Sequence, residues 1–122
     1  MSRARDRAAA AELFFALGDR TRLSVVQKLG AGGARSATAL SHGAKVSRQA
    51  IVKHLQVLEG AGLVTHERRG REVLYALEPR RLDDARAFLD AVSAGWDRAL
   101  ERLRQLVEEP EPPRPRGARE ER

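Results

Sequence analysis

The stretch from Val46 to Leu63 (VSRQAIVKHLQVLEGAGL) constrains the fold of this 122-residue chain more than any other. Ser47 can cap a helix, because its hydroxyl accepts a hydrogen bond from a free amide of the first turn. The helix should end at residues 60–62 (GAG), where glycine can adopt the left-handed conformation. Between these ends, apolar residues recur at helical spacing and form a narrow stripe that can face a core. These residues are Ile51, Leu55 and Leu58.

The opposite face of this predicted helix carries long hydrogen-bonding side chains. They are Gln49, Lys53 and Gln56, with Arg48 and Val52 at the edges. A polar face of this kind most often only meets solvent, but it is also what a helix in the major groove of DNA needs. The preceding residues favour the second interpretation. Residues 36–41 (SATALS) have the pattern of a short helix, and the glycine-containing turn at 42–45 would make the pair a helix-turn-helix.

A hairpin is predicted downstream, over residues 63–77 (LVTHERRGREVLYAL). Its turn is expected at Arg68-Arg69-Gly70-Arg71, with glycine supplying a positive φ. These arginines suit a solvated tip, but beside a helix that reads DNA they favour contact with phosphate or the minor groove. Together the elements predict a mainly α fold with a small β-hairpin wing, a winged helix-turn-helix.

The distribution of charge also favours nucleic acid as a partner. Lys and Arg number 23 against 17 Asp and Glu, which gives a formal net charge of +6. Residues 34–81 hold nine basic and four acidic residues, so this segment carries +5 of that charge. A local positive field attracts polyanions with salt-sensitive affinity, and charge alone would suit DNA, RNA or an acidic membrane surface.

The residue inventory argues against catalysis. The chain has no cysteine, which excludes disulfides, thiolate metal sites and cysteine nucleophiles. No Ser/His/Asp set or carboxylate pair stands out, and residues 30–33 (GAGG) lack the Lys-Ser/Thr of a phosphate-binding loop. We therefore expect no enzyme activity.

The N-terminal helix is expected over residues 6–17 and is strongly apolar (AAAAELFFAL). Its adjacent phenylalanines, Phe14 and Phe15, cannot both face one core comfortably. We therefore expect one of them to pack on a partner chain.

A second helix is expected over residues 20–29, with Asp19 as its N-cap. Its core stripe should consist of Leu23, Val26 and Leu29. Residues 30–33 are predicted as a loop, followed by a short strand at Arg35 and Ser36.

The longest predicted helix begins at Pro79, which suits a first helical turn, and extends to about Val107. Its apolar residues alternate in steps of three and four, the heptad pattern of a helix that packs on other helices. About 29 residues span roughly 44 Å, which is longer than so small a domain needs. We therefore expect a homodimer through the first and last helices. The residues expected at its interface are Leu13, Phe14, Phe15, Leu89, Val92, Trp96, Leu100 and Leu103.

These elements predict one DNA-binding and dimerisation domain over residues 1–107. Residues 108–122 are rich in Pro, Arg and Glu and are predicted to be a disordered tail. The apolar part of the N-terminus is interrupted by Glu12 and does not look like a signal peptide, and no apolar run approaches transmembrane length. A soluble cytoplasmic protein without membrane contact is the expectation.

Residues 13 to about 106 resemble the ArsR/SmtB family of bacterial winged-helix repressors. The resemblance is carried by FFALGDRTRLSVVQKL at 14–29, SRQAIVKHLQVLEGAGLV at 47–64 and, less specifically, RRGREVLYAL at 68–77. It implies a dimer that binds a palindromic operator in double-stranded DNA, often its own, and is released by an inducer. Together with the polar helix face, it gives these DNA-contacting residues: Ser47, Arg48, Gln49, Lys53, His54, Gln56, Arg68, Arg69 and Arg71.

The chain departs from the metal-sensing members of that family. Their cysteine motif corresponds to about residues 34–40 here, where no metal-ligand residue occurs, and the last helix has no histidine. His42, His54 and His66 fall in a turn, the reading helix and a wing strand, and do not form the converging set that zinc requires. We therefore expect no metal, no cofactor and release by an unknown non-metal signal.

Alternatives remain open at this point. They are a metal-responsive repressor with atypical ligands and a winged helix used only for protein contacts. A small-molecule pocket between the first and last helices could use Trp96, Phe15 and Phe88, although aromatic residues at this spacing are more often simply core.

Overall fold

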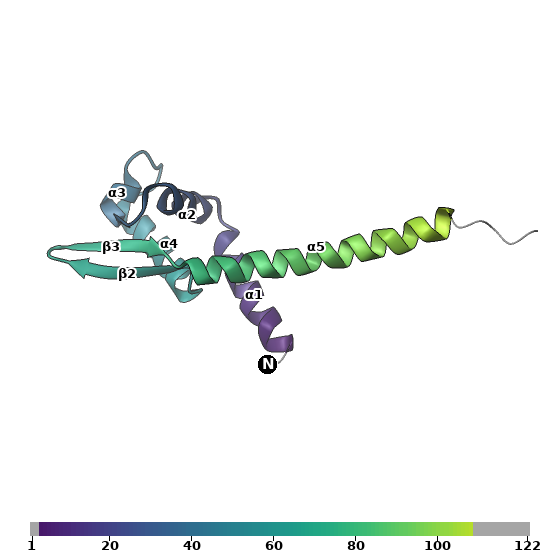
Figure 1. The fold of residues 1–122 in the computed structure, drawn as a ribbon. Helices are drawn as coiled ribbons and strands as arrows, with labels where there is room; N and C mark the ends of the chain where they lie inside the picture. The colour runs from purple at the N-terminus through teal and green to yellow at the C-terminus, as the bar shows by residue number, and fades with distance from the viewer. Residues whose placement is uncertain (1–2, 109–122) are drawn as a thin grey trace, which may run out of the picture. The chain divides into compact units, whose positions relative to one another are not determined.

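The computed structural model describes residues 3–108, with side chains from Arg5 onward. The elements in chain order are α1 (Arg3–Leu17), α2 (Arg20–Gly32), β1 (Arg35–Ser36), α3 (Ala37–Ser41), α4 (Arg48–Gly60), β2 (Val64–Arg69), β3 (Glu72–Leu77) and α5 (Pro79–Glu108); Figure 1 labels all of them except β1. The prediction of a mainly helical fold with a β-hairpin wing is confirmed. Glu108 is the last residue of α5, and the rest of the predicted tail, residues 109–122, lies outside the described residues.

The chain divides into two compact units, Met1–Phe88 and Leu89–Arg122. The first unit contains every element from α1 to β3 and the first turns of α5. Within the described residues, the second unit consists of the remainder of α5.

The core of the first unit is built on the predicted apolar stripe of α4. Ile51, Leu55 and Leu58 are at most 1% exposed, and Leu40 of α3 is fully buried with them. Burying one such side chain contributes about 1.5–3 kcal/mol relative to leaving it in water. The stripe therefore fixes which face of α4 remains available to a ligand.

The structure corrects the predicted core stripe of α2. Leu23 is 45% exposed, whereas Val25 and Leu29, four residues apart, are 2% and 3% exposed. The segment contains two overlapping apolar stripes, and the sequence pattern does not say which of them meets α4 and the sheet. The N-cap prediction is confirmed, because the Asp19 carboxylate accepts hydrogen bonds from the amides of Thr21 and Arg22.

The predicted glycine loop is also wrong over most of its length, because α2 continues to Gly32. Each glycine costs only about 1 kcal/mol relative to alanine in a helix, and the extra turn keeps its hydrogen bonds. A Cβ atom at Gly30 would lie 3.5 Å from the Leu77 side chain, an ordinary van der Waals contact, so this position packs on β3 and would accept a small side chain. The helix ends at Gly33, whose φ is +80° and whose amide donates to the Leu29 carbonyl.

A three-stranded antiparallel sheet in the order β1-β3-β2 forms the wing and its base. Strand β1 occurs where it was predicted, with Arg35 opposite Tyr75. The hairpin turn is tighter than predicted, because Arg69 still pairs with Glu72 and only Gly70 and Arg71 lie between the strands. The φ of Gly70 is +62°, as its place in the turn requires.

Glu78 alone separates the end of β3 from the start of α5. Its amide donates to the Leu63 carbonyl at 2.8 Å, which ties the base of the wing to the start of α5. Three residues later, the Arg81 side chain donates to the carbonyls of Ala61 and Ala9, both at 2.8 Å. The first turn of α5 is therefore attached to the end of α4, to the wing and to α1.

The structure corrects one residue of the predicted dimer interface. Leu13 is 1% exposed and belongs to the core of the first unit, so a partner chain cannot reach it. The neighbouring phenylalanines face different surroundings, as predicted. The Phe14 ring is half-buried with its centroid 5.6 Å from that of Phe88, whereas Phe15 is 70% exposed.

Candidate nucleic-acid interface

Helices α3 and α4 form the predicted helix-turn-helix, and each begins at a serine cap. The hydroxyl of Ser36 accepts a hydrogen bond from the Ala39 amide, and the hydroxyl of Ser47 accepts one from the Ala50 amide, both at 3.1 Å. Between the helices, Gly43 takes a φ of +77°, which an L side chain rarely adopts. These local interactions set the direction in which α4 leaves the turn.

The outward face of α4 carries the polar residues expected to contact DNA. Ser47, Arg48, Gln49, Lys53 and Gln56 are all exposed. Among the described residues, Lys53 makes no salt bridge, and Arg48 donates only to the Thr38 hydroxyl, at 3.0 Å. The face therefore offers amide, ammonium and guanidinium groups that no carboxylate neutralises.

The structure corrects the role predicted for His54. Its side chain is 23% exposed and faces α2, with Nδ1 3.3 Å from Nη1 of Arg22 and 3.8 Å from the Asp19 carboxylate. The helical wheel places His54 at the boundary between the two faces, and Arg22 and Asp19 hold it on the packed side. His54 therefore stabilises the packing of α4 against α2 and does not belong to the outward face.

Asp19 is the acidic member of this cluster. The hydrogen bond from the Arg22 amide, together with the positive charge of Arg22, holds the pKa of the Asp19 carboxyl below its ordinary value of 3.8. Arg22 also donates through Nε to the Ala16 carbonyl at 2.6 Å, so it satisfies the end of α1. The cluster joins α1, α2 and α4.

The wing presents its arginines to solvent. Arg68, Arg69 and Arg71 are exposed, and Arg69 donates to the Glu67 carboxylate at 3.1 Å. Both partners of that pair are about two-thirds exposed, so the interaction is weak and easily exchanged for another anion. In the described part of the chain, Arg68 and Arg71 form no salt bridge.

An open groove of about 670 Å³ connects the helix-turn-helix with the wing. Thr38 of α3, Arg48 of α4 and Arg71 at the wing tip all contribute to its wall. The groove brings residues 38, 48 and 71 to one surface, which the sequence pattern predicted for the last two. The sequence did not predict that Thr38 lines this groove, because nothing in the sequence distinguishes its hydroxyl from that of any other exposed threonine.

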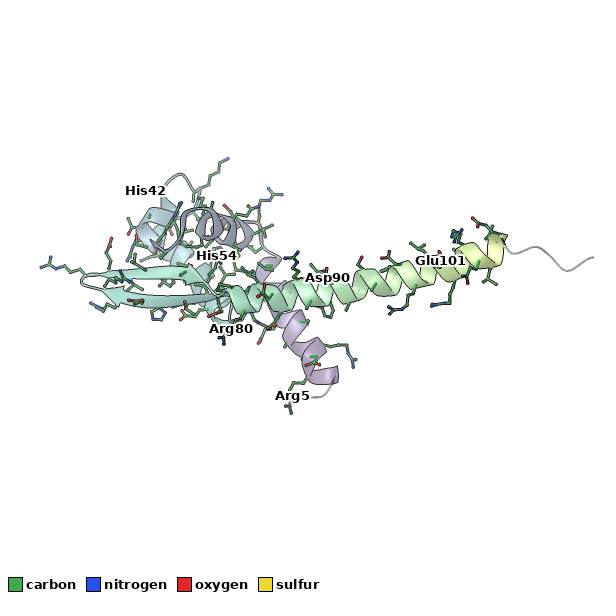
Figure 2. The ribbon with its side chains drawn as sticks, viewed as in Figure 1. Arg5, His42, His54, Arg80, Asp90 and Glu101 are labelled. Atoms are coloured by element: carbon green, nitrogen blue, oxygen red, sulfur yellow. The ribbon has the colours of Figure 1, made fainter. Side chains whose placement is uncertain are left out.

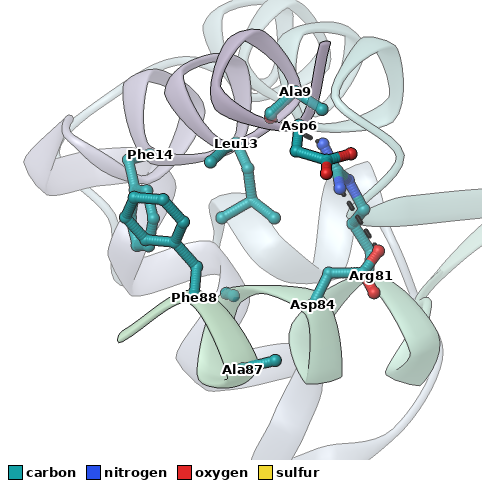
Figure 3. Close-up of a pocket in the computed structure, with 10 residues that line it drawn as sticks. Asp6, Ala9, Leu13, Phe14, Arg81, Asp84, Ala87 and Phe88 are labelled. Carbon is teal, nitrogen blue, oxygen red and sulfur yellow. Dashed lines mark hydrogen bonds and ion pairs between the residues drawn. The ribbon is translucent and has the colours of Figure 1, made fainter. Parts of the chain in front are cut away.

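A second cavity, of about 460 Å³, lies between α1 and the first turns of α5 (Figure 3). Its apolar wall includes Leu13, Phe14 and Phe88, and its polar wall includes Arg81 and Asp84. Of the aromatic residues predicted to line an effector pocket, only Phe88 lines this one. Phe15 instead lies 5.6 Å from the guanidinium carbon of Arg22, and Trp96, in the second unit, is 64% exposed.

The histidines lie in separate surroundings. His42 is exposed after α3 (Figure 2), and Nδ1 of His66 lies 2.6 Å from the Glu59 carboxylate, with its ring beside Tyr75. Among the residues that the structure describes, no three metal-ligand side chains gather closely enough to hold an ion. None of the described helices is both long enough and apolar enough to cross a membrane.

Comparisons with known proteins bear on this surface. Residues 17–67 match a helix-turn-helix domain family. The chain is 38% identical over 93 residues to the HTH-type transcriptional regulator Rv2034 of Mycobacterium tuberculosis, a match that covers 76% of this chain and 83% of that protein. It is also 38% identical over 92 residues to the HTH-type transcriptional repressor SmtB of the same species, covering 75% of this chain and 66% of the relative.

Solved structures show the same architecture. An ArsR-like transcriptional regulator from Rhodococcus sp. RHA1 superposes with a TM-score of 0.74 and 38% identity, covering 85% of this chain and 97% of that one. The homodimeric winged helix-turn-helix DNA-binding domain of a possible ArsR-family regulator from Mycobacterium bovis gives a TM-score of 0.60 at 25% identity, covering 84% and 93%.

The fold and this surface define a winged helix-turn-helix DNA-binding protein. The chain belongs to the ArsR/SmtB family of transcriptional regulators, whose members bind DNA and are not enzymes.

Proposed function

We propose that this protein is a homodimeric repressor that binds a palindromic operator, including one in its own promoter, and is released by a non-metal signal. The observation that carries the proposal is the shared surface of the helix-turn-helix and the wing. The start of α4 and the wing tip line one groove, and their cations, Arg48 and Arg71, have no carboxylate partner among the described residues. Such a surface can donate hydrogen bonds to base edges and bind phosphates at the same time.

The DNA-contacting residues in this proposal are those that lie on the exposed surface. Gln49, Lys53 and Gln56 would reach base edges from α4, with Ser47 at the phosphate beside the helix start. Arg68, Arg69 and Arg71 would bind the backbone or the minor groove from the wing. His54 is left out because it packs on α2.

The dimer would form through α5 and the exposed side of α1, with residues 1–107 acting as one functional domain. In the second unit, five apolar side chains spaced three or four residues apart along α5 are 43–64% exposed. These are Leu89, Val92, Trp96, Leu100 and Leu103. So many exposed large apolar residues on one helix are typical of a surface that a second chain covers. Phe15 would contribute from α1, since its ring is also exposed.

The release signal is proposed to be something other than a metal ion. The chain has no cysteine, so it lacks the thiolates that the family's metal sensors use before the helix-turn-helix, and its last helix contains aspartates but no histidine. Neither of these two sites can therefore be assembled with its full set of ligands.

Fluorescence anisotropy on DNA from the protein's own promoter region tests the proposal. The full chain is titrated against that duplex and a scrambled duplex of the same composition, across salt concentrations, with and without EDTA. We expect tight, salt-sensitive preference for the promoter that EDTA leaves unchanged. Release of the duplex by added Zn²⁺, reversed by EDTA, would overturn the non-metal signal, and absence of binding even at low salt would favour a module for protein contacts.

A matched pair of variants locates the surface. Lys53→Ala removes one positive charge from the outward face of α4, whereas Arg86→Ala removes one from an exposed position on α5 outside the groove. We expect only Lys53→Ala to lower the preference for the promoter over the scrambled duplex. Equal effects of the two variants would show that net charge, not this surface, determines binding.

A further inference from the structure

The first residue of α4 is held by the helix that precedes it. Arg48 donates through Nε to the Oγ1 atom of Thr38, ten residues earlier in the chain, at 3.0 Å. Both side chains are exposed and both line the groove between the helix-turn-helix and the wing. The hydrogen bond is therefore made on the surface proposed to meet DNA.

The geometry of this hydrogen bond leaves the outer end of the guanidinium free. Arginine carries five N–H donors in one rigid plane, and the Thr38 hydroxyl takes the single donor on Nε. The Nη1 and Nη2 groups remain, and this end of the plane matches the O6 and N7 acceptors of guanine. A guanidinium held at Nε also loses less rotamer freedom when it binds DNA than a free arginine side chain would lose.

The position of Arg48 at the start of α4 also indicates contact with a base edge. N-terminal residues of the second helix of a helix-turn-helix contact base edges in the major groove. A cation at this end of a helix is disfavoured by the helix dipole, and in the described part of the chain Arg48 has no carboxylate partner to compensate. Thr38 supplies the one hydrogen bond that keeps the guanidinium in place.

We propose that Thr38 is a positioning residue for sequence recognition, which orients Arg48 for a bidentate contact with a guanine of the operator. This inference rests on the proposed function and adds a recognition partner to it. Thr38 need not touch DNA itself.

The experiment begins with selection of bound duplexes from a randomised pool by the full wild-type chain, which yields a preferred sequence. Dissociation constants for that duplex and for a scrambled one are then measured for Thr38→Val, Thr38→Ser and the wild type. Valine keeps the shape of threonine without the hydroxyl, and serine keeps the hydroxyl. We expect Thr38→Val to weaken the selected duplex by about five- to tenfold, as for one lost hydrogen bond. Binding of the scrambled duplex should stay nearly unchanged, and Thr38→Ser should retain most of the preference.

The Thr38→Val change is repeated in the Arg48→Ala background. If Thr38 acts through Arg48, the second change should add nothing, because the group to be positioned is already absent. An undiminished loss in that background would mean that Thr38 contacts DNA directly or supports α3, and the inference would be overturned. An equal loss on both duplexes would also overturn it, because Arg48 would then be binding phosphate.

Single guanines of the selected duplex are then replaced by 7-deazaguanine. A purely structural role of Thr38 and Arg48 would not make the affinity depend on the N7 atom of one guanine. Removal of the N7 acceptor at one position should weaken the wild type and leave Arg48→Ala unaffected. If no guanine behaves in this way, the bidentate contact is refuted. Failure of the wild type to select any sequence would instead refute the proposed function, so the two failures are distinguishable.

Discussion

Arg81 joins three elements, and its replacement by methionine tests that arrangement. The guanidinium donates to the Ala61 carbonyl beyond the end of α4 and to the Ala9 carbonyl of α1, and it pairs with Asp84 at 3.3 Å. Methionine keeps most of the apolar stem but none of the donors. The Arg81→Met variant should therefore lower the free energy of unfolding without removing an apolar contact.

The magnitude follows from the contacts. A hydrogen bond from a charged donor contributes about 1.5–3 kcal/mol, and Arg81 makes two of them to backbone carbonyls. The Asp84 carboxylate is 65% exposed, so that pair adds little. Since the Arg81 side chain is itself 19% exposed, water can replace part of what is lost. The expected loss is about 2–4 kcal/mol.

Urea denaturation followed by circular dichroism, at a single chain concentration, measures this loss. With the urea dependence typical of a domain of this size, the midpoint should fall by about 1.5–3 M. Arg86→Met is the control, because Arg86 is exposed and has no partner in the described chain; it should change stability by less than about 0.5 kcal/mol. Indistinguishable midpoints for the two variants would refute the reasoning.

Three further predictions concern DNA binding, association and pH. Arg69→Ala should weaken promoter and scrambled duplexes alike and reduce the salt dependence of anisotropy titrations; unchanged affinity and salt slope would exclude a wing contact. Leu100→Glu should reduce self-association in sedimentation velocity, because it places a charge in the row of exposed apolar residues; an unchanged sedimentation coefficient would place the interface elsewhere. The lowered pKa of Asp19 means that its contribution to stability is present above pH of about 4 and is lost as pH falls through the lowered value. The difference in urea midpoint between wild type and Asp19→Asn should therefore shrink from about pH 6 to about pH 3, and a constant difference would argue against an ionised cap.

The sequence predicted correctly those helices and strands whose apolar pattern allows only one face to be buried. The α4 segment has a single apolar stripe, a serine at its start and glycines at its end, and the structure has a helix in that register. Where a segment contains two apolar stripes, the local pattern did not predict which of them is buried. Helix α2 contains Leu23 on one stripe and Val25 on another, and only contacts with the rest of the core decide between them.

The surface was predicted less completely than the fold, for a different reason. Arginines at a hairpin tip and glutamine on a polar helix face are visible in the sequence, but the partner of each side chain is not. His54 was assigned to the DNA-contacting residues by the family resemblance, although Arg22, thirty-two residues away, holds it inward. The role of Arg81 was likewise invisible, because the carbonyls it satisfies lie 20 and 72 residues away.

The single-residue connection between β3 and α5 limits how this protein can be re-engineered. One residue inserted at Glu78 would turn everything that follows by about 100° around the axis of α5. Such a rotation would remove Arg81 from Ala61 and Ala9 and would break the hydrogen bond between Glu78 and Leu63. The hairpin tip at Gly70 has open space around it, so an inserted peptide there would leave the core intact. We therefore expect the fold to accept an insertion at the tip of the wing, at the expense of the proposed DNA contact there, whereas the length of the chain at the base of the wing has to be preserved.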